Sequence, residues 1–265
     1  VNSQASVTER SILLNLKEKW GNPGALQSWN STSSPCSWRE INCSGDGTVT
    51  GIHLSDKSIS GAIPDFMCNL KNRTSIALAN NFIFQTCPTS WYKCSKLQYL
   101  DLSQNIFVGD LPPDINLLQK LQYLDISGNN FTGDIPPAIG NLTELKTLFL
   151  HSNLFNGTFP AEIGNLSNLE VLAMAYNQFL PAAIPPAFGK LSKAKFIWMA
   201  GTNLIGQIPE SFSSLTNLEH LDLSLNDMDG GIPSGLLLLK NLSVVLLYRN
   251  WFSGPIPSVI ESLNL

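Results

Sequence analysis

Apolar residues recur along the chain with a period of 24 residues. In each period an apolar pair of the form L-x-L or I-x-L alternates with polar or mixed positions, which predicts a short strand with its apolar side chains inward. Nine such strands are expected, centred on Ile52, Ile76, Leu100, Leu124, Leu148, Leu172, Ile197, Leu221 and Val245. Stacking them predicts an α/β solenoid with a curved, parallel sheet on its concave face.

The full period reads L-x-x-L-x-L-x-x-N-x-F-x-G-x-I-P-x-x-I/L-G-x-L. Its Asn is expected to form a buried ladder between coils, because a buried amide can satisfy backbone groups where each strand turns away. The ladder residues are Asn81, Asn105, Asn129, Asn153, Asn177, Asn226 and Asn250. Lys57 and Thr202 replace Asn in two coils, where different bonding is expected. G-x-I-P predicts an irregular convex side.

Two segments depart from the period. One extra residue follows Tyr176, which predicts a bulge between Phe179 and Ile184. Residues 1–48 do not repeat, and we interpret them as an amino-terminal capping domain before the repeats at 49–265. Ser6 and Glu9 suggest a helix-capping box, followed by an apolar helical stripe of Ile12, Leu13, Leu16 and Trp20. Leu265 would begin a tenth repeat, so the chain is expected to be truncated there.

Composition supports a repeat and excludes several classes of protein. The chain contains 40 Leu and 25 Asn, while only 14% of its residues are charged. A net charge of -4 gives no basic surplus for nucleic acid. No apolar run approaches the ~20 residues of a membrane-spanning helix. We expect no nucleic-acid partner and no cofactor.

The cysteines and sequons indicate an oxidising, extracellular compartment. Cys36 and Cys43 flank a short loop and are expected to form a disulfide that staples the cap. Cys68 and Cys94 lie at nearly the same phase of successive repeats and are placed to bridge them. Cys87 takes the core position of the Ile in I-P and is expected to be a buried free thiol. No C-x-x-C pair occurs and the three His are far apart, so no metal site is expected.

Eight Asn-x-Ser/Thr sequons occur, although an Asn-rich chain produces some by chance. Asn42, beside the first disulfide, is expected to remain unglycosylated. N-linked glycans are expected at Asn30, Asn72, Asn130, Asn141, Asn156, Asn165 and Asn241.

The cap sequence C-S-W-R-E-I-N-C, followed by repeats with G-x-I-P, resembles plant extracellular leucine-rich repeats. These occur in receptor-like kinases, receptor-like proteins and polygalacturonase inhibitors. The segments N-Q-F-L-P-A-A-I-P-P-A-F-G-K-L, W-M-A-G-T-N-L-I-G-Q-I-P and L-E-H-L-D-L-S-L-N look most like the HAESA and HAESA-like receptor kinases, whose ectodomains bind secreted peptides.

This resemblance implies a plasma-membrane receptor with a transmembrane helix and a cytoplasmic Ser/Thr kinase. The chain would be the amino-terminal part of its extracellular region. It would be non-catalytic, because it contains no glycine-rich loop, H-R-D or D-F-G. The family's basic pair for the peptide carboxyl end and its co-receptor contact would lie in later repeats.

Outward positions of the strands are the candidate binding surface. Aromatic residues there need an explanation, because a solvent-facing strand surface can be polar. We predict that an extended peptide contacts these residues, with Val171 and Leu225 beside them. The predicted contacts are Phe149, His151, Tyr176, Phe196, Trp198, His220, Leu246, Tyr248 and Arg249. The alternative is that Phe149, Trp198 and Leu246 are too separated to cooperate, or that they contact a glycan or neighbouring side chains.

Asp101 and Asp125 occupy equivalent positions on consecutive strands, about 5 Å apart at strand spacing. Such a carboxylate pair is compatible with glycosidase chemistry. Both belong to a recurring L-D-L/I-S-x-N form of the repeat, however, and no enclosing pocket is visible. We therefore interpret them as a solvated or cation-contacting pair.

Two further function classes compete with a peptide receptor. A secreted inhibitor of a cell-wall-degrading enzyme would use the same concave face to grip another protein. A structural or ice-binding repeat would show a regular, flat array of Thr or Asn, which the irregular aromatic mixture disfavours.

Overall fold

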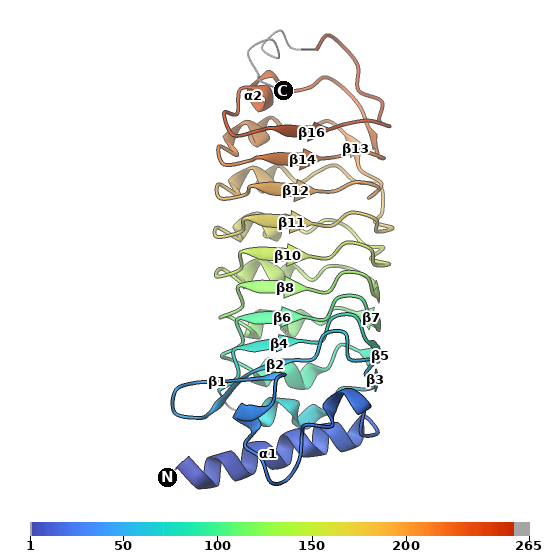
Figure 1. The fold of residues 1–265 in the computed structure, drawn as a ribbon. Coiled ribbons are helices and arrows are strands. Elements are labelled where there is room, and N and C mark those ends of the chain that lie inside the picture. Colours follow the sequence, from blue (N-terminus) through green and yellow to red (C-terminus); the bar gives the residue numbers. More distant parts are fainter. Residues whose placement is uncertain (1, 71, 257–265) are drawn as a thin grey trace.

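The computed structural model describes residues 2–70 and 72–256, which wind into a solenoid with one strand of a large sheet per coil. Figure 1 shows these strands stacked in chain order, with the amino-terminal helix lying across the first coil. The main sheet contains β1 (Ile41–Cys43), β2 (Val49–His53), β4 (Ser75–Ala77), β6 (Tyr99–Asp101), β8 (Tyr123–Asp125), β10 (Thr147–Phe149), β11 (Val171–Ala173), β12 (Phe196–Trp198), β14 (His220–Asp222) and β16 (Val244–Leu246).

The register confirms every predicted strand centre. Ile52 pairs with Ile76, Leu100 with Leu124, and the series continues to Val245. Only β1 is antiparallel to its neighbour. Between β11 and β12 the offset is 25 residues, since Leu172 pairs with Ile197. The extra residue falls in an exposed irregular segment around Leu180, as predicted.

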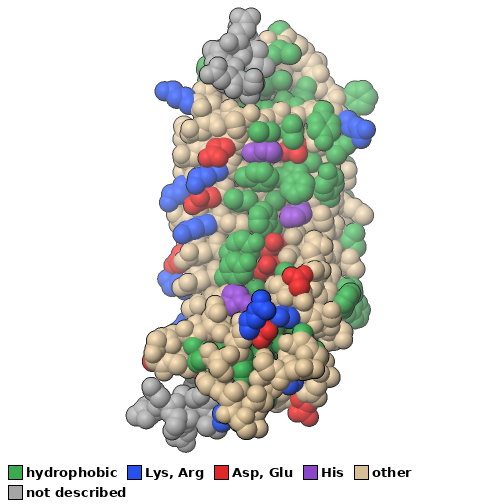
Figure 2. Space-filling view, in the orientation of Figure 1, with side chains coloured by type: hydrophobic (Ala, Val, Ile, Leu, Met, Phe, Trp, Pro, Cys, Tyr) green, Lys and Arg blue, Asp and Glu red, His purple; other side chains and the backbone are tan. Residues whose placement is uncertain are grey.

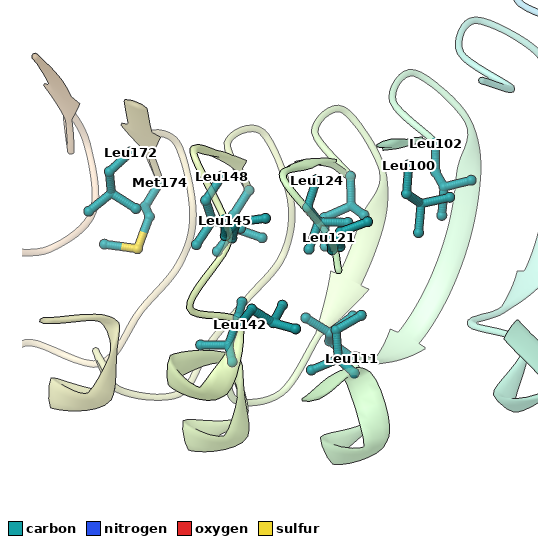
Figure 3. Close-up of a cluster of buried hydrophobic side chains, with 14 of the residues drawn as sticks. Leu100, Leu102, Leu111, Leu121, Leu124, Leu142, Leu145, Leu148, Leu172 and Met174 are labelled. Carbon is teal, nitrogen blue, oxygen red and sulfur yellow. The ribbon is translucent and has the colours of Figure 1, made fainter. Parts of the chain in front are cut away.

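The core is a stack of identical layers. Figure 3 shows Leu100, Leu124 and Leu148 projecting from successive strands toward Leu111 and Leu142 on the opposite side of the coil. Each of these five side chains is at most 3% exposed. A coil buries its apolar face only against the next coil, so the whole solenoid shares one core. Parallel rings of Phe107, Phe131, Phe155 and Phe179 run through the stack, with centroids 5.9 to 6.3 Å apart.

The asparagine ladder is present as predicted. Asn129 is 5% exposed, and its Nδ2 donates to the carbonyl oxygens of Leu102, Ile126 and Ser127 at 3.0 to 3.1 Å. Its Oδ1 accepts the backbone N–H of Phe107 in the preceding coil at 3.0 Å. One side chain thus satisfies backbone groups of two coils in a region that water does not reach.

The two ladder exceptions are bonded differently, as expected. Thr202 is fully buried, and its hydroxyl donates to the carbonyl oxygen of Met199 at 2.8 Å. The ammonium of Lys57 instead pairs with Glu40 at 3.0 Å, which joins the first coil to the cap.

The remaining sides of each coil carry short elements. Lateral strands are β3 (Ser60–Gly61), β5 (Phe82–Thr86), β7 (Ile106–Asp110), β9 (Asn130–Thr132), β13 (Ile205–Gly206) and β15 (Asp227–Met228). The convex side holds η3 (Asp65–Asn69), η4 (Thr89–Lys93), η5 (Pro113–Leu117), η6 (Pro137–Asn141), η7 (Ala161–Asn165), η8 (Pro186–Lys190), η9 (Glu210–Ser214) and α2 (Ser234–Leu237). None of the described helices is long and apolar enough to cross a bilayer.

The cap contains α1 (Asn2–Lys19), η1 (Gly24–Leu26) and η2 (Pro35–Ser37). The predicted capping box is wrong, because the helix already begins at Asn2 and Ser6 lies within it. The Glu9 carboxylate is used elsewhere: it accepts the backbone N–H of Val49 at 3.2 Å and so ties the helix to β2. The rings of Trp29 and Trp38 are stacked with centroids 5.0 Å apart, and the indole N–H of Trp29 donates to the Glu40 carboxylate.

Both predicted disulfides are present. Cys36–Cys43 closes the cap loop. Cys68–Cys94 joins Cys68, in η3, to Cys94, the residue directly after η4. Cys87 is the buried free thiol, 7% exposed, and burial raises its pKa to about 11.

The ladder predicts a large and position-specific loss of stability. Asn129→Ala leaves the Phe107 N–H and several carbonyl oxygens buried without partners, so we expect the free energy of unfolding to fall by about 2 to 4 kcal/mol. Asn217→Ala is the control, because that exposed amide makes a single inter-coil bond to Ser192. It should cost less than about 1 kcal/mol. Urea unfolding followed by circular dichroism measures both, and equal losses would contradict the role of the ladder.

Candidate functional site

Six ring side chains on the outer face of the main sheet form one continuous column. Figure 2 shows hydrophobic side chains gathered along the middle of this face, with histidines beside them. Successive centroid separations are 4.3, 6.0, 5.7, 5.0 and 5.6 Å. The members of this aromatic column, in order of contact, are Tyr99, Tyr123, Phe149, His151, Trp198 and Tyr176.

The predicted contact residues are therefore only partly brought together. Phe149, His151, Tyr176 and Trp198 belong to the column. Phe196 and His220 form a separate stacked pair at 4.6 Å. Leu246, Tyr248 and Arg249 lie on the last described strand and the turn after it, and no ring contact joins them to the column within residues 2–70 and 72–256.

Small residues on the sheet create the space that the column fills. Ala173 lies between Phe149 and Trp198 in the register and is fully buried, so the two larger rings flank a gap one strand wide. The His151 ring enters this gap and contacts both. Among the described residues, Phe149 and Trp198 are thus connected through His151, whereas Leu246 is not, and both rings contact neighbouring side chains, as the alternative to ligand binding also allowed.

Tyr176 is placed by an unusual backbone. Its φ is +55°, in the left-handed region, and the equivalent residues of other coils, such as Ser152 and Leu225, share this conformation. In the next coil the position is Gly201, where a Cβ would lie only 3.2 Å from the Tyr176 ring. Absence of a side chain there lets Tyr176, which is 49% exposed, meet Trp198 edge-on.

Asp101 and Asp125 hold turns and do not form a catalytic pair. They are opposite each other in the register, as predicted. Each Oδ1, however, accepts the backbone N–H and the hydroxyl of the serine two residues later, Ser103 or Ser127, at 2.6 to 3.0 Å. Asp222 accepts the N–H of Ser224 in the same way. The interpretation of a solvated or cation-contacting pair is wrong for Asp125, which is 8% exposed and whose pKa burial raises.

One member of the column, His151, has a buried nitrogen with an unmet hydrogen-bonding capacity. The Nδ1 atom of His151 is buried and has no partner among the described residues. Burial lowers the pKa of His151, while the carboxylate of Asp125 acts in the opposite direction. At neutral pH the column therefore presents a neutral, polarisable surface.

The sequon asparagines and most charged residues lie away from the aromatic column. All eight sequon asparagines are exposed, and only Asn42 lies on a strand of the main sheet, where its amide contacts His53 at 3.1 Å. At one edge of the sheet, charged residues alternate in sign, including the pair Lys195 and Glu170 at 2.7 Å. Among the described residues no group of three or more His, Cys, Asp or Glu is arranged to hold a metal.

Three family models match the chain. They are the leucine rich repeat N-terminal domain over residues 7–44, a leucine-rich repeat region over 89–181 and a leucine rich repeat over 214–231. The chain is a leucine-rich-repeat protein. Among solved structures, the leucine-rich-repeat ectodomain of the Arabidopsis receptor kinase HAESA, in complex with an IDA peptide hormone, superposes with a TM-score of 0.92. It is 36% identical, and the match covers 97% of this chain and 44% of that one.

Other plant proteins with leucine-rich repeats are also similar to this chain. Receptor-like protein kinase 7 of Arabidopsis thaliana is 34% identical over 115 residues, 42% of this chain and 12% of that protein. A plant ice-binding protein has a TM-score of 0.88 at 27% identity, over 97% of this chain and 83% of that one. The chain spans only a small part of the receptor kinases it matches. Its repeats and cap are similar to those of plant receptor-kinase ectodomains, in agreement with the resemblance seen in the sequence.

Tyr99 and Tyr123 are the site residues that sequence reasoning missed. They occupy the outward position before the central Leu of β6 and β8, whereas the prediction concentrated on later coils. Their signal is the repeated Y-L-D in two consecutive coils, because equal positions in adjacent coils become stacked rings. Their hydroxyls reach Asp101 and Asp125 at 3.5 and 3.4 Å.

The half-buried imidazole of His151 predicts a measurable pH effect. A histidine whose folded pKa lies below its usual 6.5 contributes stability that is present above pH 6.5 and is lost as pH falls through the lowered pKa. We expect the proton NMR titration of His151 to have its midpoint below 6.5. The loss of unfolding free energy between pH 7.5 and pH 5 should also be smaller in His151→Phe, which keeps an aromatic ring. A midpoint at or above 6.5 would contradict this expectation, because it would mean that attraction to the Asp125 carboxylate outweighs the desolvation of the imidazole.

Proposed function

We propose that this chain is the peptide-reading portion of the extracellular region of a plant plasma-membrane receptor kinase. The observation that carries the proposal is the aromatic column, which runs without interruption across the one face that the core and the ladder do not use. It supports binding of a secreted peptide, because partly exposed Trp and Tyr side chains on a rigid surface are the usual anchors of protein recognition.

The dimensions of the column suit an extended peptide. From Tyr99 on β6 to Trp198 on β12 there are four strand spacings, about 19 Å. An extended chain advances about 3.3 Å per residue, so about six residues would cover the column. Apolar side chains of the ligand would pack between the rings. Its continuation would meet Phe196 and His220, and then Leu246, Tyr248 and Arg249.

The rest of the proposal concerns the whole protein. The relatives named receptor-like kinases support a single-pass receptor with a cytoplasmic Ser/Thr kinase, and the HAESA complex with IDA and SERK1 supports recruitment of a co-receptor. We place the chain in the apoplast with N-linked glycans at Asn30, Asn72, Asn130, Asn141, Asn156, Asn165 and Asn241. None of these asparagines lies on the main sheet, so the glycans would leave the column accessible.

The fold alone does not decide between function classes, because a plant ice-binding protein shares it. Ice binding requires a regular flat array, and the outer face here carries rings of different size at different heights. A secreted inhibitor of a cell-wall enzyme would also use the outer face, but it would contact it as a large folded partner. Peptide binding is easier to test, because a short peptide would depend on contacts with the column for its affinity.

A displayed library of random 12-residue peptides tests the function directly. Binders selected on the wild-type chain should lose at least about tenfold in affinity on Trp198→Ala and on Tyr123→Ala, because each removes a central anchor. Phe84→Ala is the matched control: Phe84 is 61% exposed on β5 of the lateral sheet, away from the column, and its loss should change affinity less than twofold.

The same protein should be assayed against a fungal polygalacturonase and for inhibition of ice recrystallisation. Peptide binding that depends on Trp198, with no activity in the other two assays, supports the receptor. Failure to select any peptide, together with inhibition of the polygalacturonase, would replace it with the secreted inhibitor.

A further inference from the structure

The disulfide Cys68–Cys94 lies beside a buried cation. The guanidinium of Arg73 donates from one Nη to the Cys94 sulfur at 3.1 Å, and from the other to the carbonyl oxygen of Met67 in η3. Arg73 is 1% exposed. The guanidinium has two hydrogen-bond partners among the described residues, and of these only the Cys94 sulfur can become an anion.

Arg73 occupies a position that the repeat reserves for leucine. The equivalent residues of the next coils, Leu97, Leu121 and Leu145, are fully buried core side chains. None of the ion pairs in the described part of the chain includes Arg73, and its Nε has no hydrogen-bond partner there. Burial lowers the pKa of Arg73 to about 10, so at neutral pH it is still a cation without a counter-ion.

An uncompensated buried charge raises the free energy of the state that contains it. Reduction of the disulfide with Cys94 as a thiolate would supply the missing negative charge next to the guanidinium. The cation therefore destabilises the oxidised form relative to the reduced form, and it lowers the pKa of the thiol that leaves. A leaving thiol with a lower pKa departs faster in thiol–disulfide exchange.

The two sulfurs also differ in access. Cys94 is 6% exposed, whereas Cys68 is only partly buried at the surface end of η3. An incoming thiolate reaches Cys68 more easily, which makes Cys94 the leaving group. Cys87 does not compete as an internal nucleophile, because it is buried and remains a protonated thiol at neutral pH.

We propose that Cys68–Cys94 is a site of exchange with small thiols, at which Arg73 stabilises the departing Cys94 thiolate. The sulfur of the incoming thiolate bonds to Cys68 while the Cys68–Cys94 bond breaks and its electron pair goes to Cys94. A second thiolate then attacks the sulfur of the small thiol in the mixed disulfide and releases Cys68. In balance, two small thiols are oxidised to one disulfide, and their two electrons reduce Cys68 and Cys94.

Reaction of the folded chain with reduced glutathione at pH 7.5 tests this site. Samples are quenched with acid and alkylated, and the peptides are identified by mass spectrometry. Glutathione should be found on Cys68 at least about ten times more often than on Cys94. Arg73→Met should slow loss of the Cys68–Cys94 disulfide at least about tenfold, and Arg73→Lys, which keeps a cation, should recover most of the rate.

Cys36–Cys43 is the internal reference, and its rate should be the same in all three proteins. Arg73→Met also relieves a buried charge, so local opening must be separated from direct attack. Low urea concentrations provide this control, since direct attack on the native state is insensitive to them and an opening route accelerates. Glutathione equally distributed between the two sulfurs, a rate in Arg73→Met within twofold of wild type, or acceleration by urea would each overturn the proposal.

Discussion

The buried asparagine amide that joins each coil to its neighbours is the interaction on which the rest of the structure depends. Asn129 bonds backbone groups in its own coil and in the coil before it, in a layer that water cannot enter. Strands this short, only three residues long in most coils, have too few bonds to be stable alone. The ladder fixes the end of each strand, and the Leu and Phe layers then stack in register. Each coil thereby adds one layer to the single core that runs through the solenoid.

The outer face of the main sheet has fewer structural roles than the inner face, apart from acidic residues such as Asp125 that hold turns. The inward positions of the strands carry the core, and the turn after each strand carries the ladder. Rows of charged and amide groups bond neighbouring coils along one edge, as Lys195 does with Glu170. On the outer face of the main sheet, small residues such as Ala173 and Gly201 alternate with rings. The aromatic column is the result, and its position on a rigid sheet means that a ligand would bind it with little reorganisation.

The sequence predicts most of this fold because a repeat reports each structural rule nine times. Strand centres, ladder residues, the Cys68–Cys94 disulfide and the bulge after Tyr176 all follow from the period, whereas Cys36–Cys43 follows from the close spacing of two cysteines in the cap. The wrong predictions concern individual side-chain contacts that the repeat pattern does not specify. Ser6 and Glu9 fit a local capping pattern, but Glu9 bonds Val49, which is 40 residues away. Asp125 looks solvated in a polar motif, yet its bonds to Ser127 bury it.

The candidate site shows the same limit. The rings of the column could be assigned to the outer face from alternation alone, but their contacts depend on what lies between them. His151 joins Phe149 to Trp198 only because Ala173 is small, and Tyr176 meets Trp198 only because Gly201 has no side chain. Arg73 is a further case. The sequence shows a cation at a leucine position, but its role could not be predicted without the contact with the Cys94 sulfur.

A crystal structure of the chain with a bound library-selected peptide tests the central claim most directly. We expect an extended peptide along the main sheet, with its side chains against Tyr123, Phe149 and Trp198. A peptide seated on the lateral strands around Phe84, or held only at the last coil near Arg249, would contradict the assignment of the column as the ligand-binding surface.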